Sequence, residues 1–334
     1  MIDFTEGYGV GFYATLFDPV LWIEYGRFGI TGGSINRTNT DLRQSASLSL
    51  IDYDETIERW IRVYAFAEQL GEQTRVPLFT GIATSPSISY KGSVATYNLQ
   101  CYSVLKPIQD IFLEPGWYVD KSANGLNTIR DLLAPIGAPV ETNGDSAAIE
   151  DVIVAEGNET NLSMIEKILE AIDWIMQIEG DGTIVLSPHY TEPVTMLSGS
   201  INNVVETSFS KDRDWFDCPN CLRVIYGDSS AVAKDEDPES MLSIQNRGRE
   251  VWSVEENPAL AEDELLSEYA HRRLGELQEL SETASYTRRY LPGVNVDDVI
   301  RLGYSDLNGD FTITSQSITL GKNITTSETV KRSL

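Results

Sequence analysis

Residues 95–101 read ATYNLQC and residues 46–50 read ASLSL. In both stretches an apolar side chain stands at every second position, next to serine, threonine, asparagine or glutamine. Successive side chains of a strand point to opposite faces of a sheet, so this alternation is typical of strands with one buried face. Tyr90-Lys-Gly92-Ser93 separates two such runs and predicts a hairpin turn. These patterns predict a β-barrel or sandwich of about a hundred residues, from Val20 to Ser103.

The middle of the chain changes to helical spacing. Residues 129–136 carry an apolar stripe behind Asn127 and Thr128, which are the candidate N-caps. Gly137 follows the stripe and predicts the end of this helix. We therefore expect a small α+β domain over residues 106–200, with helices covering one short sheet.

A second helix is predicted in the same domain. Its apolar stripe runs through residues 162–175, and Thr160 or Asn161 can cap it. A hairpin is expected from Trp174 to Ser187, because the sequence EGDG at 179–182 supplies a turn between two apolar runs. This hairpin is the expected partner of the apolar helix faces.

Strand signals return after Asn203, with two interruptions. Residues 234–240, KDEDPES, lack apolar anchors and predict a mobile surface loop. Residues 258–280 predict one long amphipathic helix with acidic residues in its first turns and arginines later, an order that suits the helix dipole. Asn308-Gly309 predicts a tight turn between the last two strands. The three closing strands are expected at 285–290, 297–304 and 310–320.

Two β-rich segments thus flank an inserted domain. The predicted fold class is α+β, mainly β, with a first β domain at 1–105, the inserted α+β domain at 106–200, and a second β domain at 201–334 that carries the long helix near 258–280. Closed or paired strands in the two β domains would remove edges that otherwise aggregate.

Acidic side chains dominate the charge balance. The chain has 51 Asp and Glu against 25 Lys and Arg, a formal charge of -26 at pH 7. Binding to phosphate backbones needs clustered Lys and Arg, and the sequence has no basic run, so a stable grip on nucleic acid or anionic lipid is not expected. The carboxylates either keep a large assembly soluble or line a passage through which DNA slides; the summed charge does not choose between them.

The sequence also predicts the compartment. The first basic residue is Arg27, so we expect no secretory signal, and no segment approaches the roughly 18 apolar residues of a membrane span. Three cysteines do not make a disulfide framework in a chain of 334 residues. We expect the protein to be made in a reducing cytoplasm and kept there until assembly.

Cys218-Pro-Asn-Cys221 has the spacing of half a zinc site or of a redox pair. A structural zinc needs four ligands, and the other candidates, Cys101, His189 and His271, form no second pair. We therefore expect the two cysteines to flank a turn before a strand at 222–226, and whether they have a redox or metal role stays open.

Two glycine- and acid-rich motifs also have ordinary interpretations. Asp306-Leu-Asn308-Gly-Asp310 imitates the start of a calcium loop, but Phe311 and Ser317 stand where that loop needs glycine and glutamate, so a hairpin turn is expected. Gly7-Tyr-Gly9-Val-Gly11 lacks the spacing of a dinucleotide fingerprint, and we expect a flexible arm that orders against a neighbour.

No complete catalytic constellation is present. Two histidines and the lack of nucleophile-elbow or zinc-protease motifs leave little for acyl transfer or metal hydrolysis, and His271 is expected on a solvated helix face. A carboxylate pair of the glycosidase type stays open, because only spatial separation would reveal it. No catalytic, cofactor-binding or metal-binding residue is predicted, and no cofactor.

Several short stretches together resemble one known family. The stretch PLFTGI at 77–82, followed by YNLQCYSVL at 97–105, looks like the closing strands of the first barrel in bacteriophage tail baseplate hub proteins, the family of late-control proteins and type VI spike hubs. The order of the helix at Asn127, the helix at 162–175 with its hairpin, and the terminal run from Pro292 to Ile300 is similar too.

The resemblance implies two similar tube-like barrels in each chain and three chains in a ring of six barrels. Such a homotrimer matches a sixfold tail tube on one side and a central spike on the other. It implies a virion protein of the tail baseplate or tip, assembled in the host cytoplasm, that forms part of the DNA conduit. The implied partners are the tail tube or distal tail protein, the spike, the tape measure protein and other baseplate proteins. A fused lysozyme or spike is not expected, because the chain ends at Leu334.

Two alternatives of other classes remain. One is a tail-associated cell-wall hydrolase that uses carboxylates, which only their abundance suggests. The other is a receptor- or sugar-binding β protein that stacks ligand on Trp22, Trp60, Trp117 or Trp252. For these tryptophans, packing in the core is the more common role, because aromatic side chains bury large areas.

Overall fold

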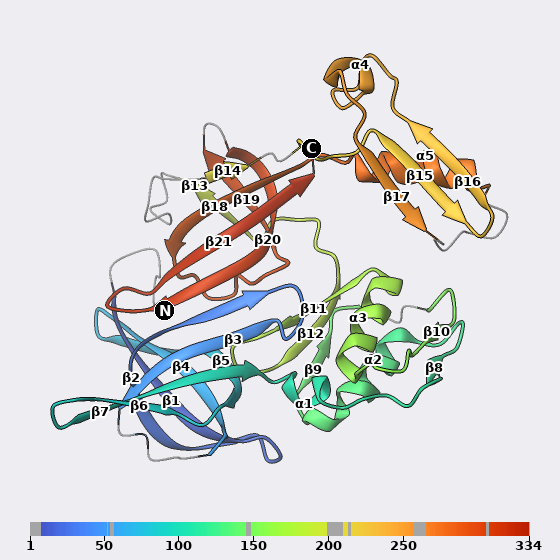
Figure 1. Cartoon of the computed structure of the whole chain (residues 1–334). Coiled ribbons are helices and arrows are strands. Elements are labelled where there is room, and N and C mark those ends of the chain that lie inside the picture. Colours follow the sequence, from blue (N-terminus) through green and yellow to red (C-terminus); the bar gives the residue numbers. More distant parts are fainter. Residues whose placement is uncertain are drawn as a thin grey trace. The chain divides into compact units, whose positions relative to one another are not determined.

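The computed structural model describes residues 8–51, 53, 57–144, 148–198, 210–212, 215–256, 265–304 and 307–333. The chain forms two compact units (Figure 1). The first unit contains Met1–Phe209 and Ser285–Val330, and the second contains Ser210–Ala284 and Lys331–Leu334. Strands outnumber helices in both, so the expectation of an α+β, mainly β, fold is confirmed.

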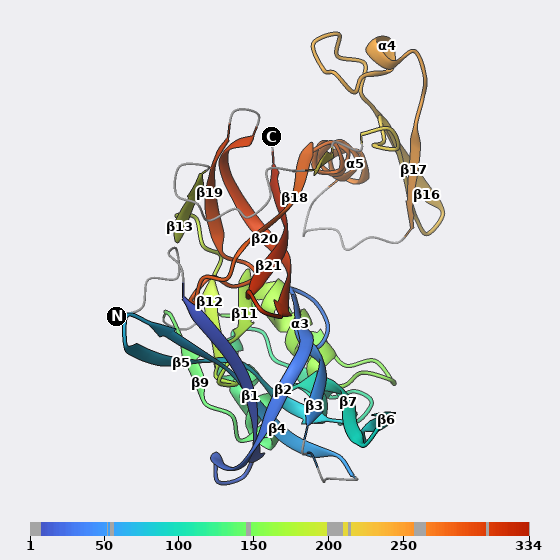
Figure 2. The same ribbon diagram turned by 90° about the vertical axis from the view of Figure 1, so that its left-hand side faces the viewer.

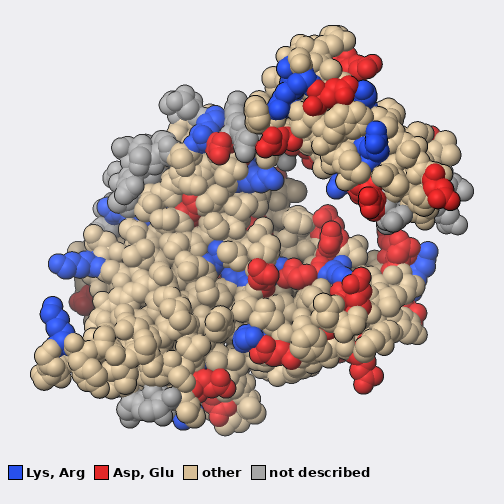
Figure 3. Space-filling model, in the orientation of Figure 1, with Lys and Arg blue, Asp and Glu red and all other residues tan. Residues whose placement is uncertain are grey.

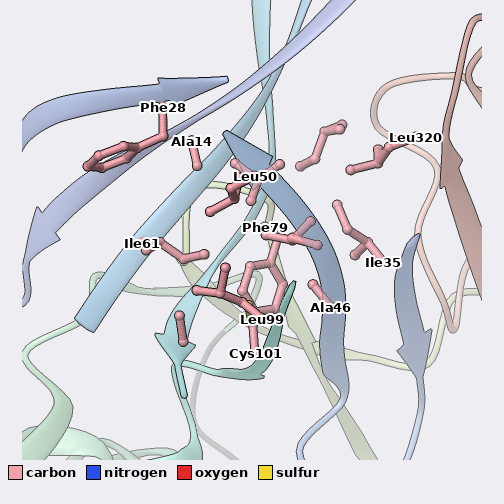
Figure 4. Close-up of a cluster of buried hydrophobic side chains, with 14 of the residues drawn as sticks. Ala14, Phe28, Ile35, Ala46, Leu50, Ile61, Phe79, Leu99, Cys101 and Leu320 are labelled. Carbon is pink, nitrogen blue, oxygen red and sulfur yellow. The ribbon is translucent and has the colours of Figure 1, made fainter. Parts of the chain in front are cut away.

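The N-terminal strands of the first unit pair in a closed circuit. Their order is β1-β4-β5-β7-β3-β2, and β2 returns to pair with β1. Apolar side chains fill the inside of this circuit, and Figure 4 shows Leu50, Phe79 and Leu99 pointing toward one another. The bounds are β1 (Gly9–Asp18), β2 (Ile23–Thr38), β3 (Gln44–Ile51), β4 (Arg59–Gln69), β5 (Glu72–Ala83), β6 (Ser87–Lys91) and β7 (Val94–Ser103).

The alternating stretches form the strands that the sequence predicts. In β3 every second side chain is buried, starting at Gln44, and Ala46, Leu48 and Leu50 point into the core. The hairpin between β6 and β7 pairs Lys91 with Val94, so its two-residue turn lies within the predicted stretch. Because a strand has a side-chain period of two, this burial pattern also sets the register against its neighbours.

The C-terminal strands of this unit lie side by side (Figure 2). Their order is β13-β19-β20-β21-β18, and β20 also pairs with β2. The strands are β13 (Thr195–Ser198), β18 (Ser281–Arg289), β19 (Val299–Tyr304), β20 (Leu307–Leu320) and β21 (Thr325–Ser333). The start of β18, up to Ala284, and the end of β21, from Lys331, belong to the second unit.

The two groups of strands are joined through their long central members. Strand β2 pairs with β1 through residues 23–29 and with β20 through residues 33–38. Strand β20 likewise pairs with β19 through residues 307–312 and with β2 through residues 315–320. Each central strand therefore changes partner halfway along its length. On its other edge β2 pairs with β3, and β20 pairs with β21 in the same way.

Between β7 and β13 the chain forms the inserted α+β part. Its helices pack on the three-stranded sheet β11-β12-β9, and one apolar cluster that includes Ile129, Ile165 and Leu186 joins them. The helices are α1 (Lys106–Gln109), α2 (Gly125–Leu133), a 3-10 turn at Ala134–Ile136, and α3 (Asn161–Ile172). The strands are β8 (Tyr118–Val119), β9 (Val140–Thr142), β10 (Ile153–Val154), β11 (Trp174–Ile178) and β12 (Ile184–Pro188).

The helix ends of this part correct two details of the sequence prediction. Asn124, and not Asn127 or Thr128, caps α2, because the Asn124 side chain accepts a hydrogen bond from the Asn127 amide. Thr160 caps α3 in a reciprocal box with Ser163, as one of the two candidates predicted. Helix α3 ends at Ile172, before Asp173 in the left-handed conformation, so Ile175 lies in a strand and not in the helix.

Gly137 ends its helical segment as predicted. It has a φ of 70° and donates its amide to Ala134 after the 3-10 turn. The left-handed conformation favours glycine, which lacks the Cβ that would clash there. The expected hairpin also forms, since β11 and β12 pair from Trp174 with Pro188 to Ile178 with Ile184.

The second unit is a three-stranded sheet with one helix. The sheet order is β16-β15-β17, and α5 covers one face by packing Tyr269, Ala270 and Leu274 against buried residues of β15 and β16. The unit also holds α4 and β14. The bounds are β14 (Ser210–Asp212), β15 (Cys221–Tyr226), β16 (Ser229–Lys234), α4 (Ile244–Arg247), β17 (Trp252–Glu256) and α5 (Leu266–Leu277).

Residues 235–240 form a loop, as predicted, but Lys234 still belongs to β16 and the loop is held by its own side chains. Asp235 accepts the Asp237 amide at 3.1 Å and the Ser240 hydroxyl at 2.6 Å. The long helix predicted at 258–280 ends at Leu277, and its predicted first turns at 258–264 lie outside the described residues. Strands predicted just after Asn203 lie outside them as well, up to residue 209.

Two turn and arm predictions are wrong. Asn308 and Gly309 lie within β20 and pair with Gly303 and Leu302, because the hairpin closes three residues earlier than predicted, where Tyr304 pairs with Leu307. Gly9 belongs to β1, which pairs with β4 of the same chain, and is therefore not part of an arm against a neighbour. Gly7 and Asp306, which begin the two motifs, lie outside the described residues.

Charged side chains of both signs are scattered over the face shown in Figure 3, with Asp and Glu the more frequent over the inserted part. Within the described residues, no helix has the length and apolar character needed to cross a membrane.

Candidate functional site

A buried polar junction lies where the three parts of the first unit meet. It joins the N-terminal strands, the inserted α+β part and the C-terminal strands. Its side chains come from β2 and the start of β3, from α3 and β11, and from the segment before β19. We take this junction as the candidate site, because buried polar groups need specific partners and so fix geometry.

The turn between β11 and β12 is held against β5. A Cβ added to Gly180 would lie 2.0 Å from the Pro77 carbonyl oxygen, so only glycine allows this approach. The Thr80 hydroxyl donates to the Gly180 carbonyl at 2.9 Å, and Arg62 donates to the Asp181 carbonyl at 2.6 Å. The hairpin of the inserted part is therefore fixed to the N-terminal strands by backbone contact and by two side chains.

Arg62 is itself held by a carboxylate of β2. It pairs with Glu24 at 2.9 Å, and Tyr64 also donates to Glu24. Burial alone would raise the pKa of Glu24, but the hydrogen bonds from Tyr64 and Arg62 hold it below its ordinary value. Burial and the Glu24 hydrogen bond raise the pKa of Tyr64 to about 12, so its phenol stays a donor.

Arg37 links β2 to β5 and to the C-terminal segment. It is 5% exposed, donates to the Leu78 carbonyl at 3.0 Å, and donates to the Asn295 side-chain oxygen. Asn295 in turn donates to the Glu179 carboxylate at 3.0 Å. One chain of hydrogen bonds thus runs from β2 through the C-terminal segment to the turn of the inserted hairpin.

A second connection runs from β11 to the segment before β19. Gln177 donates to the Val296 carbonyl at 2.7 Å and to the Asp298 carboxylate at 2.9 Å. Asp298 also accepts the Asn295 amide at 2.7 Å. Burial raises the pKa of Asp298, and the two hydrogen bonds oppose that shift.

Arg43 lies at the edge of the junction and contacts two carboxylates. It is 7% exposed and holds both oxygens of Glu166 at 2.8 Å, while Asp297 lies 3.8 Å from its guanidinium. Asp297 adopts a φ of 69°, and burial raises its pKa against the opposing effect of Arg43. An open cavity of about 340 Å³ adjoins these groups and is also lined by Glu170, His189 and Trp174.

A separate ion pair is buried within the C-terminal strands. Arg288 and Glu328 are 1% and 0% exposed and lie 2.5 Å apart. Tyr286 and Gln316 also donate to Glu328, at 2.8 and 2.7 Å. Burial would lower the pKa of Arg288, but the Glu328 charge keeps it raised, so the guanidinium stays ionised. The pair is thus satisfied by hydrogen bonds on both sides.

The cysteines take structural positions. Cys218 donates to the Leu277 carbonyl at 3.2 Å, Cys221 begins β15, and Cys101 lies in the N-terminal core. Burial raises the pKa of all three thiols. The strand predicted at 222–226 is confirmed and begins one residue earlier, at Cys221. The turn next to the cysteines covers residues 216–217, before Cys218, and is not flanked by the two cysteines as predicted.

His189 belongs to the first unit and His271 to the second, and both side chains are exposed. His189 is 3.5 Å from Asp173, and His271 lies on α5 with its ring nitrogen bonded to the Ser267 carbonyl. No group of three or more His, Cys, Asp or Glu that could hold a metal ion occurs in the part of the chain that the structure describes.

The tryptophans proposed as stacking residues divide into two groups. Trp22, Trp60 and Trp117 pack against the apolar cluster of the inserted part, which favours their structural role. Trp252 is 41% exposed on β17, with Arg223 and Lys234 over its ring at 5.4 and 5.2 Å.

Sequence inspection does not find the junction. Arg37 and Asn295 are 258 residues apart, and Gln177 and Asp298 are 121 apart. The only local signals were the turn glycines at 179–182 and the polar residues inside predicted strands, such as Arg37 and Gln177. Neither signal identifies a partner.

No family model matches the sequence, and a search of curated proteins also finds no match. Solved structures do match over the whole chain. The 43 kDa tail protein of prophage MuSo2 from Shewanella oneidensis is 14% identical with a TM-score of 0.67, and the match covers 97% of this chain and 96% of that one. The tail protein from Neisseria meningitidis MC58 is 17% identical with a TM-score of 0.67, and the match covers 98% and 97%.

A chain of the Francisella PdpA-VgrG complex is also similar. It is 8% identical with a TM-score of 0.60, and the match covers 98% of this chain but 58% of the other. The predicted resemblance to phage tail proteins is therefore confirmed for the fold, which extends over nearly the full length of this chain.

Replacing Gly180 tests the contact between the hairpin turn and β5. The Gly180→Ala substitution places a methyl group against the Pro77 backbone, which cannot give way, so we expect a loss of about 1–3 kcal/mol in the free energy of unfolding. Urea unfolding of the variant and the parent measures this difference in the free energy of unfolding. Gly11→Ala is the matched control, because a Cβ there meets no atom within 4 Å. Equal midpoints for the two variants would contradict the contact.

Single and double substitutions test the buried pair in the C-terminal strands. Arg288→Met leaves the Glu328 charge buried without its partner, and such losses are about 3–5 kcal/mol. Adding Glu328→Leu removes that charge, so the double variant is expected to regain part of the stability. Thermal and urea unfolding of the parent, both single variants and the double variant measure the coupling. A double variant that equals the sum of the singles would contradict this interpretation.

The raised pKa of Asp297 predicts a pH dependence of stability. A carboxyl that binds its proton more tightly when folded stabilises the fold fully below its unfolded pKa and loses that contribution as the pH rises through the folded pKa. Asp297→Asn stays neutral, so its stability relative to the parent should increase from about pH 4 upward. Urea midpoints at a series of pH values measure the difference. A difference that is flat or falls with pH would refute the assignment.

Proposed function

We propose that this chain is the structural hub of a bacteriophage tail baseplate or tail tip. Three copies form a ring of six β-barrels that joins the tail tube to the central spike and forms part of the DNA conduit. The fold shared with the two tail proteins supports a role in the tail. The trimer and the ring are inferences of this proposal.

The observation that carries the proposal is the repeated plan of the central strands. β2 and β20 each pair with a hairpin partner through the first half and with each other through the second half. Two modules with the same plan, joined edge to edge, can present two similar walls to an axis. Three such chains then give six similar walls, which is how a threefold assembly can fit a sixfold tube.

The proposed domains follow from the same plan. Residues 1–105 form the first barrel, 106–200 the inserted part, and 201–334 the second barrel with additional elements. The second compact unit, Ser210–Ala284 with Lys331–Leu334, is then an insertion within the second barrel domain. It contains α5, the helix that the sequence predicts near 258–280.

The proposed role is not catalytic. The carboxylates of the junction accept hydrogen bonds from side chains of the same unit, as in the Arg43–Glu166 and Gln177–Asp298 contacts. The excess of carboxylates would reduce adhesion of DNA to the wall of a conduit. The proposed partners are the tail tube or distal tail protein, the spike, the tape measure protein and other baseplate proteins, within a virion assembled in the host cytoplasm.

Native mass spectrometry and electron microscopy test the proposed hub. We expect a trimer at micromolar concentration and, in projection down its axis, six lobes of similar size arranged with threefold symmetry. Dilution and high salt are the controls for non-specific association. A chain that remains monomeric at every concentration and is also missing from purified virions would refute the proposal.

A further inference from the structure

Three buried polar atoms at the junction have no hydrogen-bond partner among the described residues. They are Nε of Arg37, Nε of Arg43 and Oε1 of Gln44. All three residues are at most 7% exposed. A buried polar atom without a partner is unfavourable by about 1–3 kcal/mol, so native proteins satisfy such atoms with protein or with ordered water.

The other polar atoms of these side chains are engaged, which fixes their orientation. Gln44 donates its amide nitrogen to the Ile178 carbonyl. A flipped amide would put two oxygens against each other, so the oxygen must be the atom that remains. Arg37 uses its two terminal nitrogens on Asn295 and Leu78, and Arg43 uses one of its own on Glu166. The unpartnered groups are therefore two N–H donors and one acceptor.

These three residues line one small cavity. Met176, Ile178 and Asp297 are among its other lining residues, and about 20 Å³ of it is open to the centre of a water molecule. A site needs roughly 10–15 Å³ by that measure and two to four polar partners to hold one water. The cavity therefore has the size for one water molecule, and its walls offer the required donors and acceptors.

We infer that this cavity is a binding site for one structural water molecule. The water accepts hydrogen bonds from the Arg37 and Arg43 N–H groups and donates to Gln44 Oε1, with a second hydrogen available to the Asp297 carboxylate. An anion would be repelled by Asp297 and by the amide oxygen. A metal cation would be repelled by the two guanidinium groups. Water can both accept from the N–H donors and donate to the oxygen acceptors that line the cavity.

The water joins the N-terminal strands to the C-terminal segment and lies beside β11 of the inserted part. Arg43 and Asp297 line both this cavity and the open cavity of about 340 Å³. This site does not depend on the proposed hub function, because it follows from the junction alone.

A crystal structure of the full chain at high resolution tests the site directly. We expect one ordered water at about 2.7–3.2 Å from Arg37 Nε, Arg43 Nε and Gln44 Oε1. A bromide soak distinguishes water from a halide, since only bromide gives an anomalous peak. Direct protein partners for all three atoms, an anomalous peak in the cavity, or a cavity without density would each overturn the inference.

Solution measurements with a variant provide a second test. Gln44→Met removes the acceptor and places a methyl group toward the cavity. Oxygen-17 relaxation dispersion should count one long-lived water fewer than in the parent. Gln100→Met is the matched control, because Gln100 is exposed and bonds to Ser47 on the surface of β3, and it should leave the count unchanged. Equal counts in both variants would overturn the inference, and circular dichroism confirms that both are folded.

Discussion

The antiparallel pairing of β2 with β20 is the constraint on which the first unit depends. It joins strands near the two ends of the chain, and Asn36 and Ser317, whose side chains bond across it, are 281 residues apart. The entropy of closing so long a loop grows only with the logarithm of its length, so the pairing tolerates a large insertion. Once this pairing forms, the points at which the chain enters the inserted part and the C-terminal segment are fixed relative to the sheet. The polar junction lies at these points.

The hydrogen bonds of the junction hold the three parts of the first unit in one arrangement. Arg37, Gln177 and Asn295 each bond to a part of the unit other than their own, so no two of the three parts can shift without breaking buried hydrogen bonds. Buried polar and charged groups of this kind add little to stability compared with apolar packing. We infer that here they specify how the three parts of the unit are arranged.

The fold is shared with tail proteins although few residues are identical. Identities of 14% and 17% accompany TM-scores of 0.67 over nearly the whole chain. A sheet requires alternation of buried and exposed positions, which many sequences satisfy, and turns of suitable length. Such a fold can therefore persist while nearly every side chain differs, and the specific surfaces that bind neighbours can differ as well.

The sequence alone predicts the strands with one buried face, the helix end at Gly137, two candidate caps for α3 of which Thr160 is the one used, and the hairpin at 179–182. Each of these depends on residues close together in the chain. The sequence also predicts a wrong turn at Asn308-Gly309, although this dipeptide is a strong local hairpin signal. Pairing of β20 with β19 places that dipeptide inside a strand. This register follows from the packing of β20 in the folded chain. The closed circuit of N-terminal strands and the polar junction also follow from the folded chain, because no local pattern encodes which residues meet there.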